Sequence, residues 1–208
     1  MSSKELGNVY AAKSVAEVAR YYDDWSATYD TFMSGVGYRH PAICMSLLTR
    51  WLPRGEGPIL DAGAGTGLVG EWLGIVGYPH VEALDISDGM IAIARKKSVY
   101  KAFHMAALGG PLPFPDGAFA GIVSSGVFTT GHVGAEGLDE LIRICRPDGV
   151  IVLTVKDTLW NGGFAEALRG HVRHRRIRLV DETPPYSSMP GEVGNIPSRA
   201  IAVKVGSD

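Results

Sequence analysis

Two kinds of hydrophobic pattern alternate along this chain. Short, continuous apolar runs are typical of buried strands, and they occur at residues 58–61, 81–85, 102–106, 121–125 and 150–155. Between these runs, apolar residues recur with helical spacing, which predicts helices at residues 42–51, from 67 onward, at 90–97 and at 136–145. Regular alternation of strands and helices is typical of a parallel sheet with right-handed crossovers.

Both ends of the chain add further elements. A helix is predicted at residues 14–22, because Ser14 and Glu17 have the spacing of a capping box. Near the other end, a helix at 164–172 precedes two strands at 176–181 and 200–205, which we expect to form a closing hairpin. The pattern therefore predicts an α/β fold, a doubly wound sheet of seven strands that is mostly parallel with a C-terminal antiparallel hairpin.

Length and composition favour one domain over residues 1–208, since 46% of the residues are hydrophobic and 20% are charged. The formal net charge of −2 disfavours nucleic acid and anionic membranes as partners. Met1–Gly7 lacks the features of a secretory leader, and no apolar stretch has the length of a membrane span. Cys44 and Cys145 lie far apart without metal-like spacing, so we expect buried thiols, a reducing cytoplasmic location and no metal site.

The stretch from Ile59 to Gly67 carries the strongest chemical signal. It reads ILDAGAGTG, which is the end of an apolar strand, an acid and three glycines at alternate positions. A glycine loop between a strand and a helix lets backbone N–H groups and the helix N-terminus approach a ligand closely. The chain is therefore expected to hold a nucleotide-like ligand at the carboxyl end of its first strand.

A second acid supports the same interpretation. Asp85 ends the next apolar strand, about 20 residues after the glycine loop, which is the distance expected for an acid that binds a ribose. A carboxylate there can accept charge-assisted hydrogen bonds from two ribose hydroxyls. Ser87 or Asp88 then provides an N-cap for the following helix.

The register of the glycines separates two kinds of nucleotide-like ligand. A dinucleotide fingerprint, G-x-G-x-x-G, fails when counted from Gly63, and counted from Gly65 it starts several residues after the strand and leaves Asp61 unexplained. The stretch instead resembles motif I of class I S-adenosylmethionine (SAM) methyltransferases, D-x-G-x-G-x-G, at every fixed position. In that family the loop passes the methionine part of SAM, and the acid helps to orient it.

Further segments resemble the same family. Residues 85–91 resemble its D-x-S-x-x-M-L pattern, with Met90 expected near the adenine and Ile91 in place of the usual Leu. Residues 111–119 and 143–149 resemble the segments that precede its fourth and fifth strands, and residues 21–30 resemble an aromatic segment that folds over SAM. The pattern is most similar to the Williams–Beuren syndrome region methyltransferase-like proteins, mainly over residues 15–155.

The resemblance implies a Rossmann-like, SAM-dependent methyltransferase. Many family members carry an acid after the third strand for the adenine amino group, and this chain lacks it, so backbone groups of Ala106 to Leu108 are expected to serve. Aromatic side chains of residues 22–29 are expected near the sulfonium. The predicted cofactor contacts are Tyr22, Trp25, Tyr29, Asp61, Gly63, Ala64, Gly65, Asp85, Ile86, Met90, Ala106, Ala107, Leu108 and Ser125.

The expected reaction is methyl transfer to a small-molecule nucleophile, by positioning and with a general base where the acceptor needs one. His132 follows the fourth strand, where substrates of the family approach, so it is the first candidate for that base and His40 is the second. A plain surface position for His132 stays open. Two alternatives also remain, a SAM-binding protein without transferase activity and a nicotinamide-dependent oxidoreductase, and the oligomeric state is left open.

Residues 1–41 are interpreted as an N-terminal tail and a mobile lid. The segment from Tyr21 to Pro41 combines aromatic residues with Gly35 and Gly37, so we expect it to be mobile without ligand and ordered over the cofactor. A static helix packed on the sheet is the competing interpretation.

A basic segment lies at residues 169–178. We interpret it as cations that complement the C-terminus of a helix rather than as an RNA contact, because the net charge is near zero.

Overall fold

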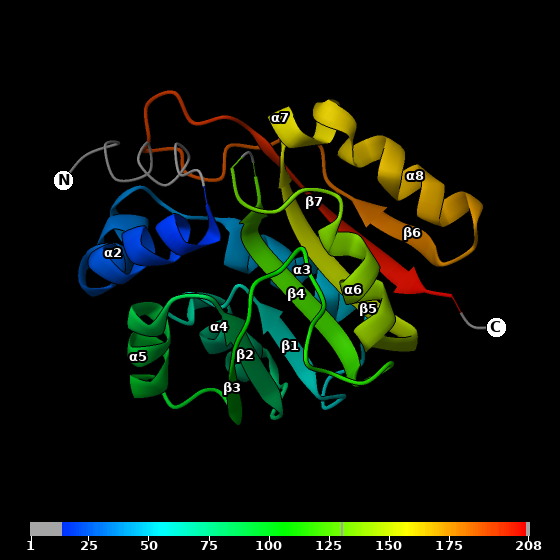
Figure 1. The fold of residues 1–208 in the computed structure, drawn as a ribbon, viewed down its shortest axis with the longest axis horizontal. Coiled ribbons are helices and arrows are strands. Elements are labelled where there is room, and N and C mark those ends of the chain that lie inside the picture. The colour runs from blue at the N-terminus through cyan, green and yellow to red at the C-terminus, as the bar shows by residue number, and fades with distance from the viewer. Residues whose placement is uncertain (1–13, 130, 207–208) are drawn as a thin grey trace.

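The computed structural model describes residues 14–129 and 131–206 and contains a seven-stranded sheet (Figure 1). The strands lie in the order β3-β2-β1-β4-β5-β7-β6. The first five are parallel to one another, and β7 is antiparallel to both β5 and β6. The predicted mostly parallel sheet with a C-terminal antiparallel hairpin is therefore confirmed.

Helices connect the strands and cover both faces of the sheet (Figure 1). The strands are β1 Ile59–Ala62, β2 Val81–Asp85, β3 Ala102–Met105, β4 Phe119–Phe128, β5 Cys145–Lys156, β6 Ile177–Glu182 and β7 Ser198–Val205. The helices are α2 Val15–Gly35, α3 His40–Trp51, α4 Leu68–Val76, α5 Asp88–Lys96, α6 Gly137–Ile144, α7 Asp157–Leu159 and α8 Ala165–Arg173, with a π-helical turn, η1, at Trp160–Phe164.

Alternate residues of the central strands supply the two halves of the core. Leu60 of β1 and Ile151 of β5 pack with α6 and α8 on one face of the sheet. Their neighbours Ile59 and Val150 pack with α3 and α4 on the other face. Both faces are therefore buried, which explains why these strands appear in the sequence as continuous apolar runs.

Several elements are longer than the sequence pattern predicts, among them β4 and α2. Strand β4 continues past Ser125 to Phe128, although Gly126 has a positive φ of 76° and the pairing with β5 shifts register in this stretch. Helix α2 continues past Tyr22 to Gly35, and the Oγ atom of Ser14 caps its start by accepting a hydrogen bond from Glu17 N at 3.2 Å. In both cases, contacts between distant segments outweigh the local preference of the residues.

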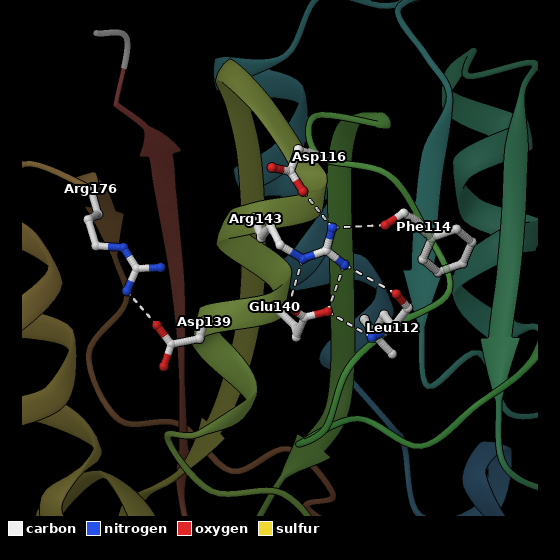
Figure 2. Close-up of polar contacts among 7 residues, drawn as sticks. All are labelled: Leu112, Phe114, Asp116, Asp139, Glu140, Arg143 and Arg176. Atoms are coloured by element: carbon white, nitrogen blue, oxygen red, sulfur yellow. Dashed lines mark hydrogen bonds and ion pairs between the residues drawn. The ribbon is translucent and has the colours of Figure 1, made fainter.

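Arg143 of α6 holds the loop that leads into β4 (Figure 2). Its guanidinium donates to the carbonyls of Leu112 and Phe114 and to the carboxylates of Asp116 and Glu140, at 2.7–3.2 Å. Glu140 also accepts a hydrogen bond from Leu112 N at 2.7 Å, and the bonds from Arg143 lower the pKa of this carboxyl to about 2. The planar guanidinium of Arg143, whose N–H donors form a fixed fork, thus joins the loop to the helix. The single ammonium group of a lysine could not make all of these contacts.

We predict that Arg143→Lys loosens this loop while the fold is retained. Lysine keeps the charge but loses the fork geometry, so amide hydrogen exchange at residues 111–118 should accelerate. Arg146→Lys is the matched control, because Arg146 makes an ion pair to Glu56 on the half-exposed surface. Equal exchange in both variants would show that the fork does not hold the loop.

Candidate functional site

A cavity of about 730 Å³ lies at the carboxyl ends of the central strands. Its lining contains most of the residues that the sequence predicts as site residues. These are Tyr22, Tyr29, Gly63, Gly65, Asp85, Ile86, Met90, Ala106, Ala107, Leu108, Ser125 and His132. The volume is within the usual range for sites that bind small molecules or cofactors.

The glycine loop lies against β4, and this contact requires a glycine at position 63. Gly63 has a φ of +84°, and a Cβ atom on it would come within 2.2 Å of Val127 Cγ2. The amides of Gly63 and Ala64 both donate to Leu84 O, at 2.7 and 3.0 Å, which fixes the start of the loop on β2. Gly67 ends the loop as the N-cap of α4 with a φ of +92°.

Asp85 ties the same loop to the end of β2. Its Oδ2 atom accepts a hydrogen bond from Gly65 N at 2.7 Å, and its Oδ1 atom accepts one from Ser87 N at 2.9 Å. Burial raises the pKa of this carboxyl above its ordinary value, and the hydrogen bonds from Ser87, Gly65 and Ile86 oppose that shift. Each carboxylate oxygen has a second lone-pair direction, so both can still accept a hydroxyl.

Asp61 lies below the loop rather than in the lining of the cavity. It is fully buried and accepts a hydrogen bond from the Tyr100 hydroxyl at 2.6 Å. Burial, the largest effect, raises the pKa of Asp61 to about 7, and the bond from Tyr100 opposes it. The same tyrosine packs on Gly70, where a Cβ atom would come within 2.3 Å of its ring, so this glycine serves helix packing rather than a dinucleotide fingerprint.

Two other predicted contacts also fall outside the lining. Trp25 is only 3% exposed, and its ring lies 4.8 Å from that of Tyr29 and 6.3 Å from that of Tyr22, between centroids. Trp25 therefore supports the two tyrosines that line the cavity. Ala64 is buried with the residues of the face that carries α3 and α4. For Trp25, Asp61 and Ala64, direct cofactor contact stays a prediction.

Helix α2 is tied to the cofactor end of the sheet by two aspartates. Asp23 accepts hydrogen bonds from the Ser87 hydroxyl at 2.6 Å and from Gly89 N at 2.8 Å, at the start of α5. Asp30 accepts a hydrogen bond from the Thr66 hydroxyl in the glycine loop and pairs with Lys97 at 2.8 Å. These contacts place Tyr22 and Tyr29 against the cavity.

The residues after β3 line the cavity near Ile86 and Met90. Ala106 N already donates to Asp85 O at 3.3 Å, so this amide is used in a hydrogen bond to the backbone of β2. Ala107 and Leu108 line the cavity beside it.

His132 also lines the cavity. Its Nε2 atom lies 3.3 Å from the Tyr22 hydroxyl, and the two rings are 5.9 Å apart between centroids. Val127, Val133 and Leu159 line the same cavity. Val15 and Val18 line the cavity too and were not among the predicted site residues, although the apolar spacing of α2 places both on one helix face.

His40 and Tyr186 lie outside the main cavity and bond to each other. His40 Nδ1 and the Tyr186 hydroxyl are 2.7 Å apart. Burial and the nearby Lys156 lower the pKa of His40 to about 3, so this imidazole is neutral near pH 7. Unlike His132, His40 does not line the large cavity.

The basic segment at the end of α8 is largely paired. Arg169 and Arg173 both pair with Glu166 at 3.0 Å, and Arg176 pairs with Asp139 of α6 (Figure 2). Within residues 14–129 and 131–206, no group of three or more metal-binding side chains occurs. In the same residues, no helix has the length and apolar character needed to cross a membrane.

The fold and the site together define a Rossmann-like protein that binds a nucleotide-type cofactor. A glycine loop follows the first strand, and an acid ends the second, at the carboxyl edge of a parallel sheet. The glycine register and the position of Asp61 before the glycines match the SAM-binding type.

Comparison with known proteins identifies the family. A model of the methyltransferase domain matches residues 60–153. Methyltransferase-like protein 27 from Homo sapiens is 32% identical over 169 residues, which cover 77% of this chain and 67% of that protein. Demethylmenaquinone methyltransferase from Clavibacter sepedonicus is 30% identical over 145 residues, which cover 68% of this chain and 59% of that protein. The chain belongs to the class I SAM-dependent methyltransferases, and its cofactor is SAM.

Solved structures confirm the fold. A TehB-like SAM-dependent methyltransferase from Corynebacterium glutamicum aligns with a TM-score of 0.63 and 21% identity, covering 89% of this chain and 98% of that one. The [4+2]-cyclase SpnF aligns with a TM-score of 0.67 and 16% identity, covering 95% of this chain and 98% of that one. Family membership, which rests on the sequence relatives, favours the methyltransferase over the two alternatives weighed from the sequence.

We predict that Asp85→Ala weakens SAM binding by roughly 1.5–3 kcal/mol, because two charge-assisted hydrogen bonds to the ribose are lost. Calorimetric titration with SAM measures the change. Asp88→Ala is the control, since Asp88 is an exposed residue in the next helix and does not line the cavity. Unchanged SAM affinity in Asp85→Ala would contradict the assignment of Asp85 as the acceptor for the ribose hydroxyls.

We predict that ionisation of Asp61 lowers the free energy of unfolding as the pH rises from about 4 to 7. Its folded-state pKa of about 7 exceeds that of an unfolded aspartate, so the folded state binds more protons in this window. The loss from this group is roughly 1.4 kcal/mol per pH unit. Urea unfolding of Asp61→Asn, which cannot ionise, should show a flatter pH profile than the wild type or the exposed control Asp24→Asn. Three parallel profiles would contradict the prediction.

Proposed function

We propose that this methyltransferase methylates a small molecule that binds in the same cavity as SAM. The observation that carries the proposal is the size of the cavity, about 730 Å³, whose lining includes His132 and Leu159 as well as Asp85 and Met90. A lining of this size holds a cofactor with a small acceptor beside it. The names of two relatives fit this class, demethylmenaquinone methyltransferase and malonyl-[acyl-carrier protein] O-methyltransferase.

The residues present fit SAM. Asp85 would accept from the ribose hydroxyls, Gly63 leaves space for close approach, and Ala107 and Leu108 would meet the adenine through their backbone. The bound cofactor supplies a methyl group that its sulfonium already activates. The chain must then align the acceptor and keep water away, and positioning of this kind can lower a barrier by roughly 7–11 kcal/mol.

His132 is proposed as the group that receives the acceptor proton. It lines the cavity, and its Nε2 atom lies 3.3 Å from the Tyr22 hydroxyl. Tyr22 thereby orients the imidazole, in the way that a hydrogen-bonded neighbour orients the general base in other enzymes.

A cytoplasmic location is part of the same proposal. Cys44 and Cys145 are free and buried, and burial raises the pKa of each thiol to about 12. Such thiols are unreactive and are typical of proteins in a reducing compartment. A nucleic-acid partner remains disfavoured by the net charge of −2.

We predict that His132→Gln lowers turnover by roughly 10²–10⁴-fold and leaves SAM affinity unchanged, because the proton acceptor is lost but the cofactor contacts remain. The assay transfers labelled methyl from SAM to a panel of small alcohols, phenols, amines and thiols. His174→Gln is the control, since His174 is exposed at the end of α8. Full activity in His132→Gln would exclude the base, and methylation of protein or RNA alone would overturn the small-molecule proposal.

We predict that SAM binding protects residues 21–41 from hydrogen exchange more than the strands of the core. Tyr22 and Tyr29 line the cavity, so a bound cofactor adds contacts beneath α2. The aspartate contacts to α5 and the glycine loop would then strengthen a segment that is less stable without ligand. Exchange measured with and without S-adenosylhomocysteine tests this, and equal protection in both states would leave α2 as a static helix.

A further inference from the structure

A second, smaller cavity adjoins the large one. It has a volume of about 30 Å³, and Tyr22, Tyr29, Gly126 and Thr129 line both cavities. The two cavities therefore adjoin at these residues, and Gly126 contributes no side chain between them.

The only charged side chain among the described residues that line this second cavity is Lys156, at the end of β5. It is 9% exposed, and its Nζ atom donates to Asn195 Oδ1 and to Ile196 O, both at 2.9 Å. An ammonium has three donors, so one remains. Within the described part of the chain, no carboxylate pairs with Lys156, and its neighbour Asp157 pairs with Arg199 instead.

Two buried hydroxyls face the same space. Ser188 and Ser198 line the second cavity and are both 0% exposed. Neither Oγ atom has a hydrogen-bond partner among the residues that the structure describes. A buried hydroxyl without a partner destabilises the folded state, and a buried cation without a counter-charge destabilises it more.

The positive charge, the number of hydrogen-bond donors and the volume of this cavity all match a carboxylate group. Lys156, Ser188 and Ser198 can together donate three hydrogen bonds, and no carboxylate lies among the described lining residues to repel an anion. A water-sized atom needs about 10–15 Å³ of such volume, so a cavity of about 30 Å³ has room for two oxygens. Burial lowers the pKa of Lys156, which an anion beside it would reverse.

We propose that this cavity is a carboxylate subsite for the methyl acceptor, so that the substrate is an acid with an apolar body. The apolar body lies in the large cavity, near Val127, Val133 and Leu159, and the carboxylate reaches Lys156 past Tyr22 and Tyr29. This inference rests on the proposed small-molecule function. The carboxylate anchors the acceptor, and the atom that is methylated lies elsewhere on it.

NMR titration of the protein loaded with S-adenosylhomocysteine tests the subsite without turnover. The probes are hexanoate and phenylacetate, each compared with its amide, which has nearly the same shape without the charge. We expect each acid to bind at least tenfold more tightly than its amide, with shifts at Ser188 and Ser198 amides. Equal affinity of acid and amide, or no binding of either acid, would overturn the proposal.

Variants separate a specific subsite from general attraction. Lys156→Met should abolish the preference for the acid, and Lys101→Met, which changes an exposed lysine, should keep it. Should Lys156→Met fail to fold, the double variant Ser188→Ala and Ser198→Ala should still reduce acid affinity several-fold and leave S-adenosylhomocysteine affinity unchanged. A preference that survives the loss of either set of donors would contradict the subsite.

The two proposals fail in different ways. Transfer of labelled methyl to neutral small molecules, with no preference for acids, would overturn the carboxylate subsite and leave the small-molecule function in place. The absence of transfer to any small molecule, with carboxylate binding at Lys156 intact, would overturn the function and not the subsite.

Discussion

The carboxylate of Asp85 lies at the junction of three elements. It ends β2, accepts a hydrogen bond from Gly65 in the loop after β1, and accepts another from Ser87 at the start of α5. The Ser87 hydroxyl in turn donates to Asp23 of α2. The placement of the glycine loop, the N-terminus of α5 and the helix above them thus depends on one buried acid, which is also the group expected to bind the ribose.

Much of this arrangement could be predicted from sequence because its signals are local. Continuous apolar runs identify strands buried on both faces, and the spacing from the glycine loop to Asp85 follows from one strand–helix–strand unit. The cavity lining contains the glycines, the acid and His132 as expected. Each of these residues lies at or near the carboxyl end of a parallel strand, where the topology alone determines position.

The remaining features depend on contacts between distant segments, for which the sequence has no local signal. Asp61 precedes the glycines, yet it faces Tyr100, which lies 39 residues later. Trp25 is in an aromatic segment, yet it packs beneath the tyrosines rather than in the cavity. The second cavity gathers Lys156, Ser188 and Ser198 from a strand end, a loop and the last strand. Only the folded chain brings such residues together.

The contact between Gly63 and Val127 lies in the lining of the large cavity. Val127 reaches to within 2.2 Å of the place where a Cβ atom on Gly63 would lie, and it also lines the wall towards His132. A larger residue at position 127 would press on the cofactor loop, whereas a smaller one would enlarge the space for the acceptor. A smaller side chain at position 127 can therefore shift the preference towards bulkier acceptors. A larger side chain, which would favour smaller acceptors, is restricted because the cofactor loop must stay in place.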